Sequence, residues 1–145
     1  GDNAMTWQIS TQHALAQLAA TLAFADAGNG PSALHLYATT QPAAGAAPGG
    51  DAMAVIVMAV PCGSITGGVL TLHPADPAGA MVTATGLPRW ARWVRADGVM
   101  VGDCTVTDAA SGGDLTITGA ATPAGETSPQ LYAGGRALLG AVNLT

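Results

Sequence analysis

Charged residues are scarce in this 145-residue chain, and lysine is absent. Charged residues make up 9% of the sequence, against about 25% in an ordinary soluble domain. Nine acids face four arginines, which gives a formal net charge of −5. Non-specific affinity for nucleic acid comes from Lys and Arg that neutralise phosphates. The composition therefore argues against a nucleic-acid partner, and the low charge favours a surface that another protein covers. The lack of lysine by itself is also what a GC-rich coding sequence produces.

Aromatic residues and long apolar runs are also few. Phe, Trp and Tyr together make up 4% of the chain, so each large ring is expected in a core or an interface. The longest apolar run, residues 52–61, is about half the length that a membrane-spanning helix needs, and no contact with a membrane is expected. The N-terminus lacks the basic and apolar regions of a secretory signal. We interpret residues 1–9 as an N-terminal arm or tag remnant.

Only two cysteines, Cys62 and Cys104, are present. Two cysteines are too few to define a disulfide framework. We expect both to be buried thiols of an intracellular product, with a disulfide between them as the alternative.

One segment near the N-terminus carries a helical period. Leu15, Leu18 and Leu22 recur at spacings of three and four residues, which is typical of one face of a helix. Ser10 or Thr11 can cap its start, and a Gly and Pro cluster at residues 28–31 ends it. The spacing predicts a helix within residues 10–27.

From residue 33 onward the pattern changes to short, β-branched segments separated by turn residues. Regular spacing of about ten residues is typical of a sandwich, a jelly roll or a small barrel. We predict a single domain over residues 1–145 of mainly β class, in which residues 33–145 form a β-sandwich or jelly roll of about eight antiparallel strands behind one N-terminal α-helix. The expected strands are 34–37, 52–60, 69–73, 80–85, 89–96, 99–101, 104–107, 115–118 and one last strand supplied by the tail at 131–132 and 137–144.

Several details follow from local signals. The run 52–60 is continuously apolar and stops at Pro61, which favours a buried central strand. Asp97 and Gly98 predict a tight hairpin turn, and residues 111–114 predict a second hairpin. The Pro, Ala and Gly-rich loop at residues 39–51 is long enough to suggest an arm or a partner-binding segment.

Sequence signatures of catalysis and of cofactor binding do not stand out. Residues 28–33 match the letters of a dinucleotide fingerprint, but they follow a helix and precede a strand, the reverse of the true motif. Asp97, Asp108 and Asp114 lie in turns, where Asp is favoured for its local hydrogen bonds. We expect no cofactor and no enzymatic activity.

The residues that most often hold metals or act as nucleophiles are isolated. His13, His35 and His73 have no partner at ligand spacing, so a metal site is unsupported. Ser64 lacks the setting of a nucleophile elbow, and Cys62 has no cationic neighbour that would lower its pKa. We interpret both as structural.

One cluster is unusual, since it holds three of the four cations and two of the three tryptophans. On a strand, Arg89, Trp93 and Arg95 share one face, and Trp90 and Arg92 share the other. One interpretation is a half-buried strand whose Arg stems cover the sheet and whose Trp rings fill the core. The other is a partner interface, because Trp and Arg are enriched at binding hot spots. The first is favoured for Trp93, and the two are about equal for Arg89 and Arg92.

The order and spacing of several short motifs carry a resemblance over residues 10–120. The motifs are LHLY at 34–37, TTQP at 39–42, GVLTL at 68–72, ATG at 84–86, ARWVRADG at 91–98, GDCTV at 102–106 and SGGDLTI at 111–117. This pattern resembles a family of small virion structural proteins of tailed double-stranded-DNA phages, whose defined members are jelly-roll capsid cement or decoration proteins. The chain departs from the pattern after about residue 120.

The resemblance implies a protein that self-associates, as a dimer in the simplest case, and clamps neighbouring major capsid subunits on the outer surface of the virion after assembly in the host cytoplasm. Arg89, Trp90 and Arg92 would then meet the capsid. Two alternatives stay open. One is another head–tail or tail component, and the other is a carbohydrate-binding β-sandwich. An enzyme such as a small hydrolase is the least favoured.

Overall fold

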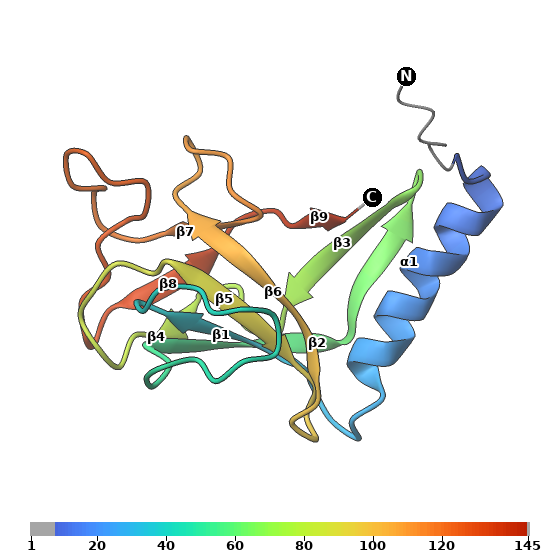
Figure 1. Cartoon of the computed structure of the whole chain (residues 1–145), viewed down its shortest axis with the longest axis horizontal. Helices are drawn as coiled ribbons and strands as arrows, with labels where there is room; N and C mark the ends of the chain where they lie inside the picture. Colours follow the sequence, from blue (N-terminus) through green and yellow to red (C-terminus); the bar gives the residue numbers. More distant parts are fainter. Residues whose placement is uncertain (1–7, 145) are drawn as a thin grey trace.

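The computed structural model describes residues 8–144, and its helix forms where the periodicity predicts it. Helix α1 spans Thr11–Asp26, and the Ser10 side chain accepts a hydrogen bond of 3.0 Å from the His13 amide at its start. The buried face carries Leu18 and Ala25, and the helix packs along β2 and β3 (Figure 1). The helix predicted at 10–27 is confirmed to within a residue or two at each end. Residues 1–7 of the predicted arm lie outside the described residues.

The rest of the described chain is mainly β, as predicted. Nine strands form one sheet in the order β4-β8-β7-β6-β5-β1-β2-β3-β9. Their bounds are β1 (Ala33–Tyr37), β2 (Ala54–Thr66), β3 (Val69–Pro74), β4 (Ala80–Met81), β5 (Trp90–Val94), β6 (Met100–Thr107), β7 (Leu115–Thr118), β8 (Arg136–Leu139) and β9 (Asn143–Leu144).

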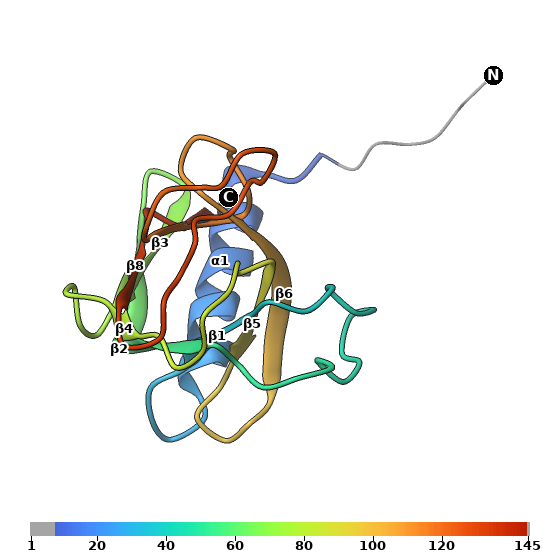
Figure 2. The ribbon, with the colours of Figure 1, turned by 90° about the vertical axis from the view of Figure 1, so that its left-hand side faces the viewer.

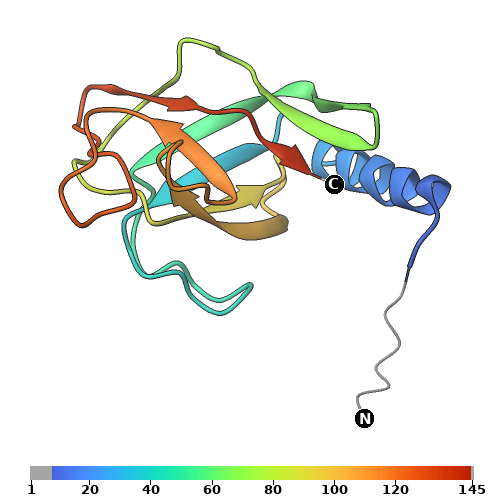
Figure 3. The same ribbon diagram turned by 90° about the horizontal axis from the view of Figure 1, so that it is seen from above.

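The sheet curls until β4, at one end of the order, meets β2. An isolated antiparallel bridge joins Val82, just after β4, to Ala54 at the start of β2. The Thr83 amide also donates to the Met53 carbonyl at 2.8 Å. The strands therefore form a single curled sheet in place of two facing sheets, with β3 and β9 extending from the second half of β2 (Figures 1 and 3).

The apolar strand behaves differently from its prediction in two ways. Pro61 does not end it, because β2 continues to Thr66. The pairing of β2 with β3 shifts register between Met58 and Gly63, and a proline without an amide hydrogen is tolerated at such an irregularity. The strand is also not buried on both faces, since Ile56 is buried while Val55 and Val57 are exposed.

Three further strand predictions need correction. The strand expected at 80–85 is short, because only residues 80–81 pair as β4. The second hairpin is wrong: β6 and β7 pair in parallel, with Val106 opposite Leu115. The intervening loop folds back on itself, as the Thr107 hydroxyl accepts from the Gly113 amide at 2.8 Å. The tail forms two strands, β8 and β9, which bond to different neighbours.

The hairpin between β5 and β6 forms as predicted, with Gly98 at φ +89° in its turn. Inside the curled sheet, one buried apolar cluster joins residues from almost every strand and from α1. Its largest fully buried members are Leu34, Leu36, Met58, Leu70, Leu115, Ile117 and Leu131.

Candidate functional site

Strand β5 carries the Trp and Arg cluster and divides it between two faces. Ala91 and Trp93 point into the core. The indole nitrogen of Trp93 donates to the Ser32 hydroxyl at 3.0 Å, so the only polar atom of the ring is satisfied. Trp90 and Arg92 lie on the outer face of the sheet, opposite Thr105 and Asp103 of β6. The predicted sharing of faces along β5 matches this arrangement.

Trp90 is fully buried although it lies on the outer face. Its ring stacks on Tyr37 at a centroid distance of 4.6 Å and an angle of 18°. Its indole nitrogen donates to the Thr39 hydroxyl at 3.1 Å. Burial is also the main cause that raises the pKa of Tyr37. Trp90 and Trp93 are therefore interior residues of this chain, which agrees with the core interpretation favoured for Trp93. Neither ring is exposed for the partner interface predicted at residues 89–95.

Arg92 holds the loop between β1 and β2 against this stack. Its guanidinium makes two hydrogen bonds to Asp103, at 2.7 and 3.1 Å, and a third to the Ala46 carbonyl at 2.7 Å. It also lies over the Trp90 ring, 5.2 Å from the centroid. The hydrogen bonds to Asp103 are the main cause that raises the pKa of Arg92. The loop projects from the body (Figures 2 and 3), but it is tied to the sheet and is not a free arm.

The other two cations of the cluster also have partners within the chain. Arg89 pairs with Glu126 at 2.6 Å, and their side chains are 41% and 32% exposed. Arg95 pairs with Asp97 at 2.6 Å and lies 4.8 Å from the Phe24 ring centroid, which connects the hairpin to the end of α1. Of the five predicted site residues, Arg89 is the most exposed and so the one best placed to reach a partner.

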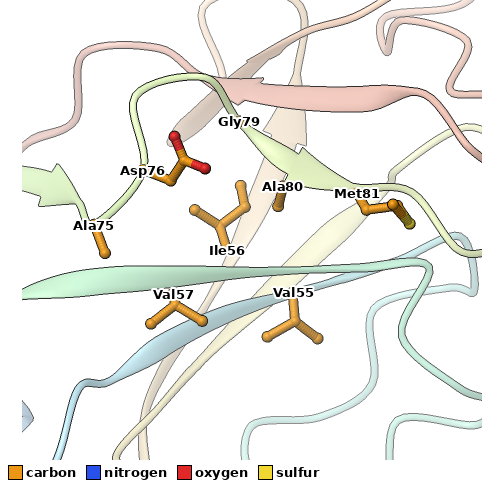
Figure 4. Close-up of a pocket in the computed structure, with 8 residues that line it drawn as sticks. All are labelled: Val55, Ile56, Val57, Ala75, Asp76, Gly79, Ala80 and Met81. Carbon is orange, nitrogen blue, oxygen red and sulfur yellow. The ribbon is translucent and has the colours of Figure 1, made fainter.

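The sequence reasoning missed an exposed apolar surface on the outer face of β2. Val55 and Val57 are 40% and 43% exposed, and Met81 is 58% exposed. With Ala75, Asp76, Gly79 and Ala80 they line a shallow cleft of about 200 Å³. In Figure 4, Val55 and Val57 point to one side of β2, and Ile56 points to the other. We name Val55, Val57 and Met81 the β2 patch.

An apolar row continues from the β2 patch across the outer face of the sheet. Val57 pairs with Ala33, Ala33 pairs with Val94, and Val94 pairs with Met100. Ala33, Val94 and Met100 are each partly exposed. Side chains of directly paired residues lie side by side on one face, so the row forms a continuous apolar strip over β2, β1, β5 and β6. A uniformly apolar strand sequence gives no sign of which alternate positions will face solvent.

Two further places in the chain hold side chains of the types that act as nucleophiles in enzymes. The Ser64 hydroxyl and His73 Nε2 are 3.0 Å apart on the β2–β3 hairpin, both exposed. Within residues 8–144, no carboxylate is hydrogen bonded to His73 to complete a triad. The pKa of Cys62 is raised to about 12, by burial and by the nearby Asp26 carboxylate. A neutral, buried thiol is a poor nucleophile.

The cysteines are both free thiols, with Cys62 buried and Cys104 partly buried. Burial, followed by the charges of Asp114 and Asp103, raises the pKa of Cys104 to about 11. Over the described part of the chain, no cluster of three or more His, Cys, Asp and Glu side chains is placed to hold a metal ion. Across the same residues, no helix is long and apolar enough to cross a membrane.

Comparison with known proteins gives no relative: no family model, no curated protein and no solved structure matches this chain. The class that the fold and site define is thus a mainly β domain with an exposed apolar strip and with three ion pairs among its described residues.

Proposed function

We propose that this chain is a virion structural protein, a capsid cement that binds the outer surface of a tailed-phage head and stabilises the contacts between major capsid subunits. The observation that carries the proposal is the exposed β2 patch and the apolar row that extends from it. Exposed apolar patches on a domain commonly mark protein interaction sites. The resemblance over residues 10–120 supplies the kind of partner.

The energetics of the β2 patch suit a protein that acts by contact area. Fully burying a Val or Met side chain stabilises by about 1.5–3 kcal/mol. Since 40–58% of each patch side chain is exposed, covering the patch contributes about 1 kcal/mol per residue. Charged groups are few, and three of the four arginines are paired with a carboxylate within the chain. Asp76 is the one charged residue that lines the cleft, so little charge loses its water when a partner covers this surface.

In this proposal the chain acts without catalysis and without a cofactor. Its partners are the major capsid protein and a second copy of itself. A dimer with two-fold symmetry uses the same surface on both copies, and such a dimer can sit on a local two-fold axis of a shell. Arg89, exposed beside Glu126, is a polar contact that can exchange its internal partner for an acidic capsid residue.

The test mixes the purified chain with heads, prepared without it, from the phage or prophage that encodes it. The chain is expected to sediment with the heads and to raise their melting temperature. Val57→Glu places a charge in the β2 patch and is expected to abolish both effects. Leu15→Glu, at an exposed apolar position on α1, is the matched control and is expected to bind like the natural sequence.

Each of the other outcomes rejects part of the proposal. Failure to bind heads or to stabilise them rejects the cement function. Binding to tails, or ring formation in solution, favours the head–tail or tail alternative. A carbohydrate-binding function is less supported, because Trp90 and Trp93 are buried and offer no exposed ring for a sugar on β5.

A further inference from the structure

A second hollow lies inside the curled sheet, away from the β2 patch. It has a volume of about 180 Å³, and its apolar lining comes from several strands and from the tail: Leu34, Leu72, Trp93, Leu115, Val142 and Leu144. We name it the inner cavity. An engineered apolar cavity of about 150 Å³ stays dry and binds benzene, so the inner cavity is large enough for a molecule of that size.

Gly102 of β6 explains why the space is empty. Gly102 pairs directly with Trp93, so a side chain at position 102 would point to the same, inward face of the sheet. A Cβ atom built there has no atom within 4 Å. Gly102 thus faces the core without a side chain. The empty space beside it lies against the Trp93 ring.

The chemistry of the lining sets the kind of ligand. The Trp93 indole nitrogen is already bonded to Ser32, which leaves the ring as an apolar wall. Burial is the main cause that raises the pKa of Cys104 to about 11, so its thiol is neutral at pH 7. The other contributors to that shift are the negative charges of Asp114 and Asp103, and Asp114 lines the cavity from an exposed position. The Asp114 carboxylate, whose Oδ2 accepts from the Thr105 amide and hydroxyl at 3.4 and 3.1 Å, places one negative charge at the edge of an otherwise apolar cavity.

We propose that the inner cavity binds one small apolar molecule, an aromatic ring or branched aliphatic of about six to nine non-hydrogen atoms, and that Asp114 makes the mouth favour a cationic substituent over an anionic one. This binding site is separate from the β2 patch and does not depend on the proposed capsid function. Asp103 reinforces the preference only weakly, because its carboxylate is paired with Arg92 on the outer face.

The test uses the full chain and three probes of the same ring: toluene, benzylammonium and benzoate. Affinities are measured at pH 7 by ligand-detected NMR and by thermal melts. Dissociation constants on the order of 1 mM or below are expected for toluene, since the best very small ligands gain a large binding free energy for each non-hydrogen atom. At ten times the dissociation constant, the ratio of folded to unfolded chain rises about elevenfold. Benzylammonium is expected to bind at least tenfold more tightly than benzoate.

Variants locate the site. Gly102→Leu fills the space beside Trp93 and is expected to reduce toluene affinity by tenfold or more. Val142→Phe narrows the cavity from the tail and serves as a second blocking variant. Thr66→Val, at an exposed position on β2, is the control and is expected to leave binding unchanged. Asp114→Asn is expected to remove the difference between benzylammonium and benzoate while toluene still binds.

The remaining outcomes overturn the proposal. If none of the three probes binds at millimolar concentration, the cavity is not a ligand site. If toluene binds equally well to both blocking variants, the ligand occupies another place. If benzoate binds as tightly as benzylammonium to the natural sequence, the assigned role of Asp114 is wrong.

Discussion

The ion pair between Arg92 and Asp103 is expected to be the most important charge interaction for stability. The side chains are 12% and 3% exposed, and Arg92 also bonds to the Ala46 carbonyl at 2.7 Å. Asp103→Asn keeps the size of the side chain and removes its charge. The guanidinium then stays buried but faces an Asn side chain. The carbonyl oxygen of that side chain can accept a hydrogen bond, whereas its NH2 group can only donate.

The expected loss in the free energy of unfolding follows from how deeply the two side chains are buried. Breaking a buried pair by removing one partner costs about 3–5 kcal/mol, and the remaining exposure of Arg92 lowers this to about 2–4 kcal/mol. The exposed pair of Arg89 and Glu126 provides the matched control, because it has the same chemistry at 41% and 32% exposure. Exposed pairs contribute about 0–1 kcal/mol, so Glu126→Gln is expected to cost less than about 1 kcal/mol.

The assay is urea unfolding at pH 7, followed by tryptophan fluorescence. In a parallel thermal melt, a loss of 3 kcal/mol in the free energy of unfolding corresponds to a drop in melting temperature of roughly 10 °C for a domain of this size. Loss of Arg92's anchor should also make the loop at residues 38–53 easier to cleave with a protease. Equal losses for Asp103→Asn and Glu126→Gln, or a loss below 1 kcal/mol for both, would refute the reasoning from burial.

Three further predictions follow from the structure. Gly63→Ala is expected to cost about 1–3 kcal/mol, because a Cβ there meets the Thr71 carbonyl, and an unchanged urea midpoint would contradict this. Both thiols should resist iodoacetamide at pH 8 in the folded state and react on unfolding, because burial raises their pKa values to about 12 and about 11; rapid alkylation of the native chain would disprove it. Stability should fall on acidification in two steps, read from urea midpoints between pH 8 and 3. The first lies below about 6.5, where unfolded His35 gains a proton that burial disfavours in the fold. The second lies below about 4.5, where three carboxyl groups have pKa values below their ordinary range because each accepts a side-chain hydrogen bond. Asp97 accepts from Arg95, Asp108 from Thr122 and Glu126 from Arg89. Folded pKa values below the unfolded ones mean that the unfolded chain binds more protons as the pH falls. A flat profile down to pH 4 for the natural sequence, or an upper step that persists in His35→Gln, would be inconsistent with the His35 assignment.

The Trp and Arg cluster shows where sequence reasoning reached its limit. Residue types enriched at interfaces are the same types that fill cores and hold loops. In this chain the deciding partners lie far away in the sequence: Thr39 bonds to Trp90, Ser32 bonds to Trp93, and Glu126 pairs with Arg89. No local pattern reveals these contacts, so the assignment of buried and exposed members required the tertiary structure.

The strand predictions failed for related reasons. The pairing partner of a strand is set by which surfaces can be buried together, and turn residues alone do not define it. Residues 111–114 look like a hairpin turn, yet the loop folds back and β7 joins β6 in parallel. The tail likewise divides between two neighbours, since β8 pairs with β7 and β9 pairs with β3. Gly140 lies between them, where a Cβ would collide with Thr116.

The sequence by itself determined the features that depend on neighbours along the chain. Leu15, Leu18 and Leu22 recur at helical spacing, Ser10 caps the helix, and Asp97 with Gly98 closes the hairpin, because each signal acts within a few residues. Low charge is likewise a property of composition. Only the tertiary structure decided that the sheet curls, that Val55 and Val57 face solvent, and that Gly102 leaves a cavity beside Trp93. Those features depend on pairings between distant segments, where burial is shared by residues that the sequence keeps apart.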